Sequence, residues 1–78
     1  MTANEFLRLL ADTLRTDEKI EVGTKRTDIK EWDSMGQISI MSMLEEKFGV
    51  TLEMEELVSL EGIQDIVNIL KQRDINLG

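Results

Sequence analysis

The sequence contains no cysteine and no histidine. Without cysteine the chain has no disulfide, no thiol nucleophile and no cysteine-based metal site, and without histidine it lacks the usual general base near neutral pH. We therefore expect no metal. The carboxylates occur as adjacent pairs, such as Glu45 and Glu46, on polar helix faces. Because nothing in the pattern would shift their pKa values as acid-base catalysis requires, we do not expect the chain to be an enzyme.

Aromatic residues make up only 4% of the chain, too few to provide a platform on which nucleic-acid bases could stack. Nine basic residues face sixteen acidic ones, and the net charge is −7. That charge repels phosphate backbones and anionic lipids and favours partners with basic surfaces. No apolar run is long enough to cross a bilayer, and the first residues do not resemble a signal peptide. We expect a cytosolic protein that binds no nucleic acid and inserts into no membrane.

Proline is also absent, and no stretch alternates polar and apolar residues as a strand would. Instead, apolar residues recur every three or four positions in four segments, residues 3–14, 34–48, 53–58 and 61–73. A chain of 78 residues has room for one core. The sequence therefore predicts an all-α fold, a small four-helix bundle with three longer helices and one short helix, forming a single domain over residues 1–78.

Local signals refine these segments. Thr2, with Glu5 three residues later, predicts a capping box at the first helix, and Gly49 predicts the end of the second. In the second helix we expect a buried stripe, broadened by Ile40 and Met43, whose main members are Met35, Ile38, Met41, Leu44 and Phe48. The connection over residues 15–33 is long for a compact domain. Its apolar residues are expected to fix it to the core, namely Ile20, Val22, Ile29 and Trp32.

Ser34 stands where this loop meets the second helix, in the tripeptide Trp32-Asp33-Ser34. Two interpretations remain open. Ser34 and Gln37 fit the S-x-x-Q capping box, which would occupy the hydroxyl, whereas capping by Asp33 would leave it free. Trp32 is interpreted mainly as a plug on the core that determines where the loop delivers Ser34. Gly36, in the first turn, is either a glycine that this position simply tolerates or one that leaves bare backbone beside the hydroxyl for another protein to approach.

Asp33-Ser34-Met35 resembles the Asp-Ser-Leu signature of acyl carrier proteins and related peptidyl and aminoacyl carriers, with methionine in place of leucine. Residues 44–50, with the sequence Leu-Glu-Glu-Lys-Phe-Gly-Val, resemble the stretch that closes the second helix in that family. The resemblance covers nearly the whole chain and is loosest over residues 16–30. It implies the acyl-carrier-like form of the predicted bundle.

The resemblance also implies a function for Ser34. A phosphopantetheinyl transferase would move 4′-phosphopantetheine from coenzyme A onto the hydroxyl, and the thiol of this covalent cofactor would hold an acyl or aminoacyl group as a thioester. Asp33 would help the transferase dock. The further partners implied are a loading ligase and a downstream acyltransferase or synthase, met by a monomer in brief complexes.

The family recognises partners mainly through the second helix. The positions that correspond in this sequence are Met35, Gly36, Ile38, Ser39, Glu45 and Glu46. Carriers of the fatty-acid type commonly have acidic residues where this chain has Gly36 and Ser39. Charges at the rim of an interface influence which partner binds. The absence of acidic residues at these two positions therefore predicts a carrier for a dedicated pathway rather than for general fatty-acid synthesis. Glu45 and Glu46 are equally well explained as a solvated helix face.

The resemblance places an acyl pocket in the interior. Its lining would be Leu44, Leu52, Leu57, Leu60 and Ile66. Family members that bury long acyl chains often have smaller residues at the positions of Leu57 and Ile66, so we predict a shallow pocket suited to short, polar or aminoacyl cargo. The alternative function is an unmodified acidic helical module that binds a basic partner through residues 34–48. The acidic residues of segment 28–33 lack the spacing of a calcium-binding loop.

Overall fold

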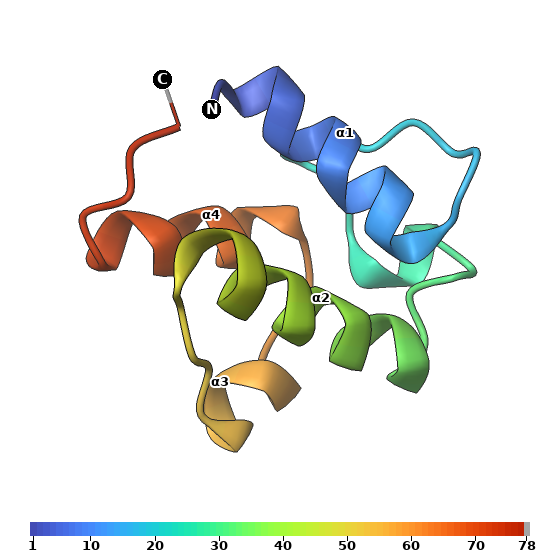
Figure 1. Ribbon diagram of the computed structural model, residues 1–78. Coiled ribbons are helices and arrows are strands. Elements are labelled where there is room, and N and C mark those ends of the chain that lie inside the picture. Colours follow the sequence, from blue (N-terminus) through green and yellow to red (C-terminus); the bar gives the residue numbers. More distant parts are fainter. Residues whose placement is uncertain (78) are drawn as a thin grey trace.

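The computed structural model describes residues 1–77 and has the predicted all-α architecture (Figure 1). Its helices are α1 (Ala3–Leu14), α2 (Ser34–Phe48), α3 (Met54–Val58) and α4 (Ile63–Gln72), with a 3-10 turn, η1 (Arg26–Asp28), in the long loop. The described residues contain no extended strand, only one isolated bridge between Lys25 and Gly62. Gly78, the last residue of the predicted domain, lies outside the described residues.

Helix α1 begins as the sequence predicts. The Glu5 amide donates to Thr2 Oγ1 at 3.2 Å, and the Thr2 amide donates to Glu5 Oε1 at 2.9 Å, which completes the capping box. The helix buries Phe6, Leu10 and Leu14. These three residues share one face of the helix because they are spaced by four, and they form the α1 side of the core.

The loop between α1 and α2 is held by buried side chains and by backbone bonds to the start of α4. Ile20, Ile29 and Trp32 are buried as predicted, but Val22 is 39% exposed, so the prediction that it pins the loop is wrong. Val22 lies at the tip of a turn closed by the bond from the Thr24 amide to the Glu21 carbonyl, and the tip faces solvent.

Two backbone hydrogen bonds tie this loop to the other end of the chain. The Arg26 amide donates to the Glu61 carbonyl at 2.8 Å, and the Ile63 amide donates to the Thr24 carbonyl at 3.0 Å. Segments more than thirty residues apart in sequence are therefore neighbours, and η1 is fixed beside the α3–α4 connection.

Helix α2 is rotated relative to the predicted stripe. Met35 is 69% exposed and Ile38 is 48% exposed, so their assignment to the buried face is wrong. The residues that α2 buries are Gly36, Gln37, Ile40, Met43 and Leu44. Apolar side chains occur on several faces of this helix, so the pattern alone leaves its rotation undetermined. The helix ends at Gly49, which has a left-handed φ of 67°.

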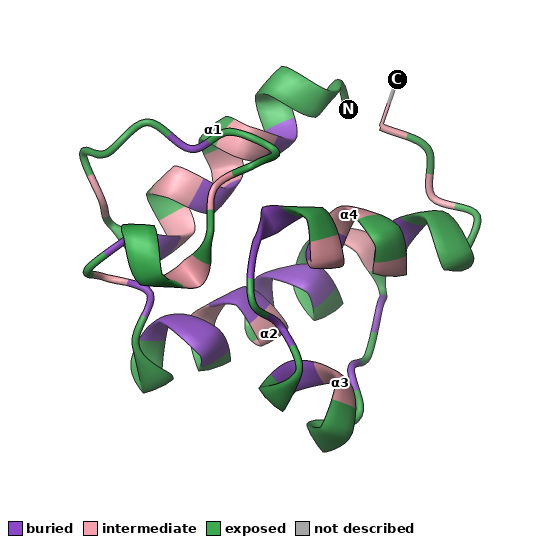
Figure 2. Cartoon of the chain, turned by 180° about the vertical axis from the view of Figure 1, so that it is seen from behind, coloured by how far each residue is buried: buried purple, intermediate pink, exposed green. Residues whose placement is uncertain are grey.

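The core is one continuous cluster to which all four helices contribute. In Figure 2 the buried residues cover much of α2 and the segments on either side of α3. Phe6 of α1 meets Phe48 of α2 edge to face, with 5.6 Å between ring centroids. Ile63, Ile66 and Leu70 of α4 are fully buried at the predicted spacing.

Candidate functional site

Ser34 is the first residue of α2 and its side chain is exposed. The helix is capped by Asp33, whose Oδ1 accepts a hydrogen bond from the Gly36 amide at 2.9 Å. This decides between the two interpretations of the sequence, because the carboxylate performs the capping for which the Ser34 hydroxyl was the other candidate. The predicted S-x-x-Q capping box is therefore wrong, and Ser34 presents its hydroxyl to solvent.

Gln37, the other member of that box, is buried and holds the site together from within. Its Oε1 accepts a bond from the indole Nε1 of Trp32 at 2.6 Å, and its Nε2 donates to the Leu57 carbonyl at 2.6 Å. One amide thus joins the loop, α2 and α3. Trp32 is only 2% exposed, which confirms its role as a plug beneath the loop.

Gly36 is buried, contrary to the expectation of bare backbone open to a partner. A Cβ atom at this position would lie 2.5 Å from the Glu31 carbonyl oxygen and 2.9 Å from Leu14 Cδ2. The first contact is shorter than any side chain tolerates and involves backbone that cannot move aside easily. Glycine is therefore needed here so that the start of α2 can pack against the end of the loop and α1.

A groove of about 370 Å³ opens beside Ser34 between α2 and α3. The residues that line it are Arg26, Ser34, Gln37, Ile38, Met41, Met54, Leu57 and Val58. Three of its apolar side chains are largely exposed, those of Ile38, Met54 and Val58. The site therefore combines a free hydroxyl with an apolar channel that leads away from it.

A second hollow, of about 330 Å³, lies on the α1 side of Ser34. Asp33, Met35 and Ser39 line it together with Glu31, whose Oε1 is buried without a hydrogen-bond partner among the described residues. The predicted partner-recognition residues thus divide into two groups. Met35, Gly36 and Ser39 line this second hollow, and Ile38 lines the groove with Ser34. Glu45 and Glu46 are exposed about 16 Å further along the helix than Ser34, at 1.5 Å per residue.

Comparison with known proteins identifies the family of the chain. Residues 4–70 match a family model described as "Phosphopantetheine attachment site". The chain belongs to the acyl carrier protein family. It is similar to an acyl carrier protein from Petrotoga mobilis (strain DSM 10674 / SJ95), with 32% identity over 78 residues that cover 94% of this chain and 92% of that protein. The cofactor of this carrier is accordingly 4′-phosphopantetheine, attached covalently, and its role is to carry acyl groups as thioesters.

The residues predicted to line an acyl pocket lie in the carrier's packed core. Leu44, Leu60 and Ile66 are at most 1% exposed, and Leu52 is also buried. Of the five predicted residues, only Leu57 borders the groove beside Ser34. Leu57 therefore lies at the border of the groove, whereas Ile66 belongs to the buried core.

Sequence reasoning missed several residues of the groove. Met54 and Val58 are four apart on α3 and therefore share one face, a spacing that could have marked them as a second apolar stripe beside Leu57. Arg26 had no such signal. It reaches the groove because η1 is held beside α4, and its Nε donates to the Trp32 carbonyl at 3.2 Å.

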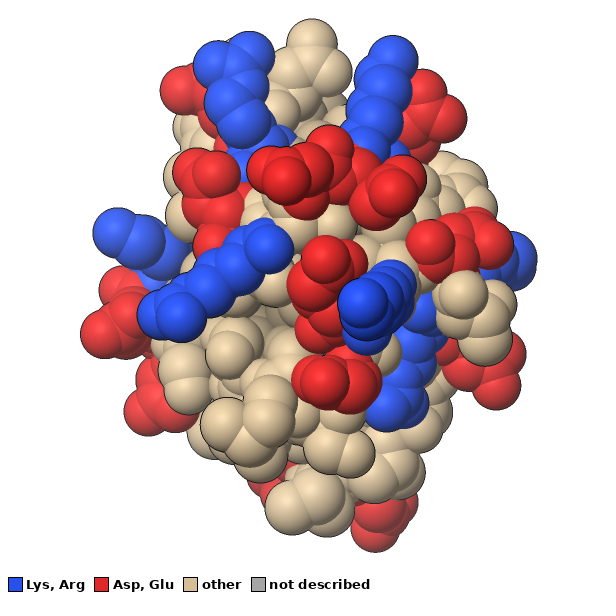
Figure 3. All heavy atoms as spheres, turned by 90° about the vertical axis from the view of Figure 1, so that its right-hand side faces the viewer, with Lys and Arg blue, Asp and Glu red and all other residues tan. Residues whose placement is uncertain are grey.

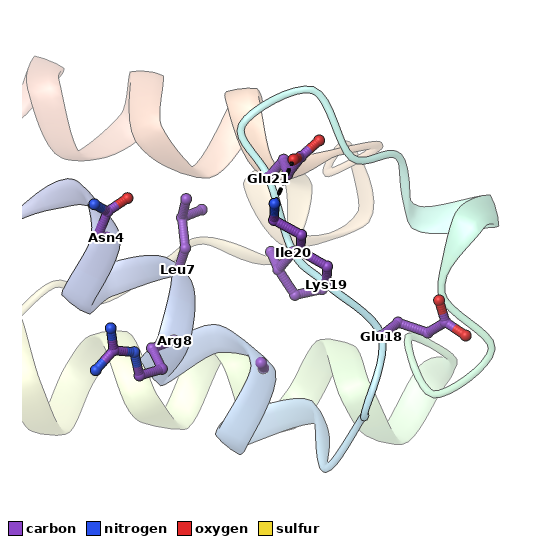
Figure 4. Close-up of a pocket in the computed structure, with 8 residues that line it drawn as sticks. Asn4, Leu7, Arg8, Glu18, Lys19, Ile20 and Glu21 are labelled. Atoms are coloured by element: carbon purple, nitrogen blue, oxygen red, sulfur yellow. Dashed lines mark ion pairs between the residues drawn. The ribbon is translucent and has the colours of Figure 1, made fainter.

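A further hollow, of about 420 Å³, lies away from Ser34, between α1 and the loop. Figure 4 shows this hollow, which is lined by Asn4, Leu7 and Arg8 of α1 and by residues 18–21, where Lys19 pairs with Glu21 at 3.4 Å. Both members of this pair are well exposed, so it adds little to stability. No group of three or more metal-ligating side chains gathers anywhere in residues 1–77, and no helix in that range is long and apolar enough to span a bilayer.

Proposed function

We propose that Ser34 is the residue to which 4′-phosphopantetheine is attached. The observation that carries this proposal is the exposed Ser34 hydroxyl, left free by the Asp33 cap and placed at the mouth of the groove. In the transfer, Ser34 Oγ attacks the phosphorus of coenzyme A that bears pantetheine. A new P–O bond forms, the pyrophosphate P–O bond breaks, and adenosine 3′,5′-bisphosphate leaves with the electron pair while the transferase accepts the hydroxyl proton.

The bound cofactor supplies the thiol that this cysteine-free chain lacks, and cargo is held on that thiol. The chain's own residues position the attachment point. Asp33 holds the first turn of α2 through the Gly36 amide, and the Trp32–Gln37–Leu57 bonds hold that turn against α3. Asp33 is exposed, and we propose that its carboxylate also contacts the transferase.

The test is incubation with coenzyme A and a promiscuous phosphopantetheinyl transferase, followed by intact mass measurement. The wild-type protein should gain one phosphopantetheinyl group, and Ser34→Ala should gain none. Ser42→Ala is the matched control, because Ser42 is an exposed serine on the same helix and its loss should leave loading intact. An unchanged wild-type mass would instead favour the alternative of an unmodified acidic interaction module.

We further propose that the cargo is short, polar or aminoacyl. Support comes from the burial of the predicted lining, since a long acyl chain would have to displace Leu44, Leu60 and Ile66, which are at most 1% exposed and belong to one core cluster. The open groove with Met41 and Met54 offers a shallower place for a small group. Amide chemical shifts of holo-protein loaded with acetyl or octanoyl groups provide the test. With either the acetyl or the octanoyl group, the chemical shift changes should be confined to residues that line the groove. Large shift changes at Leu60 and Ile66 in the octanoyl-loaded protein would contradict the proposal.

We also propose that the carrier serves a dedicated pathway, with its own loading ligase and downstream acyltransferase or synthase. The surroundings of Ser34 on α2 support this, because Gly36 leaves no room for a side chain and Ser39 is uncharged. An acyltransferase of general fatty-acid synthesis should therefore load the holo-protein poorly. Ser39→Glu should raise its kcat/KM, and Ser42→Glu, which adds the same charge one turn away, should raise it less. Equal gains would argue against position-specific recognition.

The same proposal assigns the chemistry to partner enzymes. The chain is proposed to be a non-catalytic, cytosolic monomer that meets each partner in turn. Sedimentation velocity of holo-protein should give the mass of one chain.

A further inference from the structure

Arg26 is the only cationic side chain among the groove-lining residues that the structure describes. It belongs to η1, eight positions before Ser34, and both residues line the same groove. Its side chain is oriented by the 3.2 Å bond from Nε to the carbonyl of Trp32, which is two residues before Ser34. This single bond uses one of the five N–H groups of the guanidinium.

The remaining N–H groups of Arg26 are free for another ligand. Within residues 1–77 Arg26 forms no ion pair, since the two pairs in that range are Lys19–Glu21 and Arg73–Glu56. Asp33, which follows Trp32 in the sequence, accepts a bond from the Gly36 amide. Arg26 is also half-buried, which limits the side-chain entropy that it would lose on binding an anion.

The segments that form most of the groove are predominantly acidic, so Arg26 is a cation in acidic surroundings. Residues 33–61, which include α2 and α3, contain seven acidic residues and one lysine. Figure 3 shows the face at the right of Figure 1, where acidic and basic side chains are interspersed above and the lower part is largely uncharged. A single guanidinium fixed at the edge of an apolar groove is suited to an anion that enters at that edge.

We propose that the Arg26 guanidinium binds the phosphodiester attached to Ser34 and thereby directs the pantetheine arm into the groove between α2 and α3. This inference rests on the proposed attachment at Ser34. Arginine binds phosphate oxygens through paired, charge-assisted hydrogen bonds, which a point charge such as lysine does not reproduce. The anion would also stand at the first turn of α2, where the helix dipole favours negative charge. Arg26 is then a positioning residue, not a catalytic one.

The experiment compares apo- and holo-protein by two NMR signals, with mass spectrometry establishing loading first. In wild type, conversion to the holo form should shift the Arg26 Nε–Hε resonance. The ³¹P resonance of holo Arg26→Gln should move towards that of urea-unfolded holo-protein, and Arg26→Lys should move in the same direction by less. Lys30→Gln removes the same charge from an exposed position on the same loop and should leave the ³¹P resonance in place.

The outcomes separate this inference from the function on which it rests. If no phosphopantetheine is gained, attachment itself fails. If loading is normal but the wild-type Arg26 signal is identical in apo- and holo-protein, the proposed contact is absent and only this inference is overturned. That comparison needs no variant, so it holds even if Arg26→Gln fails to fold. A purely structural arginine would change the stability of the variants without moving the ³¹P resonance of folded protein.

Discussion

The indole nitrogen of Trp32 donates a 2.6 Å hydrogen bond to Oε1 of Gln37, and both side chains are buried. Trp32 ends the long loop and Gln37 lies in the second turn of α2, so the bond fixes the segment that contains Ser34 from both sides. Gln37 then continues the connection to the Leu57 carbonyl of α3. The exposed hydroxyl and one wall of the groove are therefore positioned by one buried amide.

Gln37→Leu should destabilise the protein by about 2 kcal/mol or more. The substitution leaves the Trp32 N–H buried without a partner, which costs about 1–3 kcal/mol. It also removes the Gln37 bond to the Leu57 carbonyl, which keeps only its 3.3 Å bond from the Leu60 amide. Urea unfolding followed by tryptophan fluorescence gives the free energy of unfolding. Gln64→Leu is the control, because Gln64 bonds only to Asn68 on the surface and its loss should cost well under 1 kcal/mol. Equal effects would mean that the buried bonds contribute nothing.

Gly36→Ala should cost about 1–3 kcal/mol, the range for overpacking a tight contact. Its Cβ would meet the Glu31 carbonyl at 2.5 Å, so the start of α2 would have to move away from the loop. Gly23→Ala provides the contrast, because a Cβ at Gly23 has no atom within 4 Å. Thermal unfolding gives the melting temperature of both variants. If the two substitutions lower the melting temperature equally, the contact with Glu31 does not account for the cost at Gly36. Loading at Ser34 should also slow in Gly36→Ala.

Ile38→Gln should lower kcat/KM for transfer of phosphopantetheine by about five- to tenfold. Interface residues near the centre of a contact are the minority whose truncation costs about 1 kcal/mol or more, and Ile38, which lines the groove beside Ser34, is expected to be one of them. Stability should change by less than about 0.5 kcal/mol, because Ile38 is 48% exposed. Val22→Gln is the control, an exposed apolar residue at the tip of a turn in the long loop. A similar loss of rate in both variants would contradict a specific role for the groove.

Glu56 should make stability depend on pH. The bond from the Glu53 amide is the main cause that lowers the pKa of Glu56, and the Arg73 guanidinium, bonded at 3.0 and 3.1 Å, lowers it further. A carboxyl whose pKa is lower in the folded state stabilises the protein above its unfolded pKa, near 4.5. This contribution is lost as the pH falls through the lower folded pKa.

The measurement is the difference in unfolding free energy between wild type and Glu56→Gln across pH. The difference should be constant above pH about 6 and shrink as the pH falls below about 4, where the carboxyl becomes protonated in both states. Glu55→Gln, an exposed neighbour in α3, should give a smaller and flatter difference. If the difference in unfolding free energy between wild type and Glu56→Gln grew as the pH fell, the Glu56 carboxylate would not stabilise the folded state as argued.

Much of the fold follows from short-range signals in the sequence. The cap formed by Thr2 and Glu5, the end of α2 at Gly49 and the buried spacing of α4 each depend on residues within a few positions of one another. The position of Ser34 at the start of a helix is local in the same way. Local hydrogen bonds and helical periodicity suffice to determine these features, so they could be predicted without coordinates.

The rotation of α2 and the groove were decided only by tertiary structure. Met35 and Ile38 are as apolar as the buried Ile40 and Leu44, so burial depends on which face meets α1 and α3. The contact of Gly36 with Glu31 and the bonds of Gln37 select that face. Arg26 joins Ser34 at the groove through backbone bonds that link residues more than thirty positions apart. Such contacts exist only once the chain has folded, because no neighbouring residue encodes them.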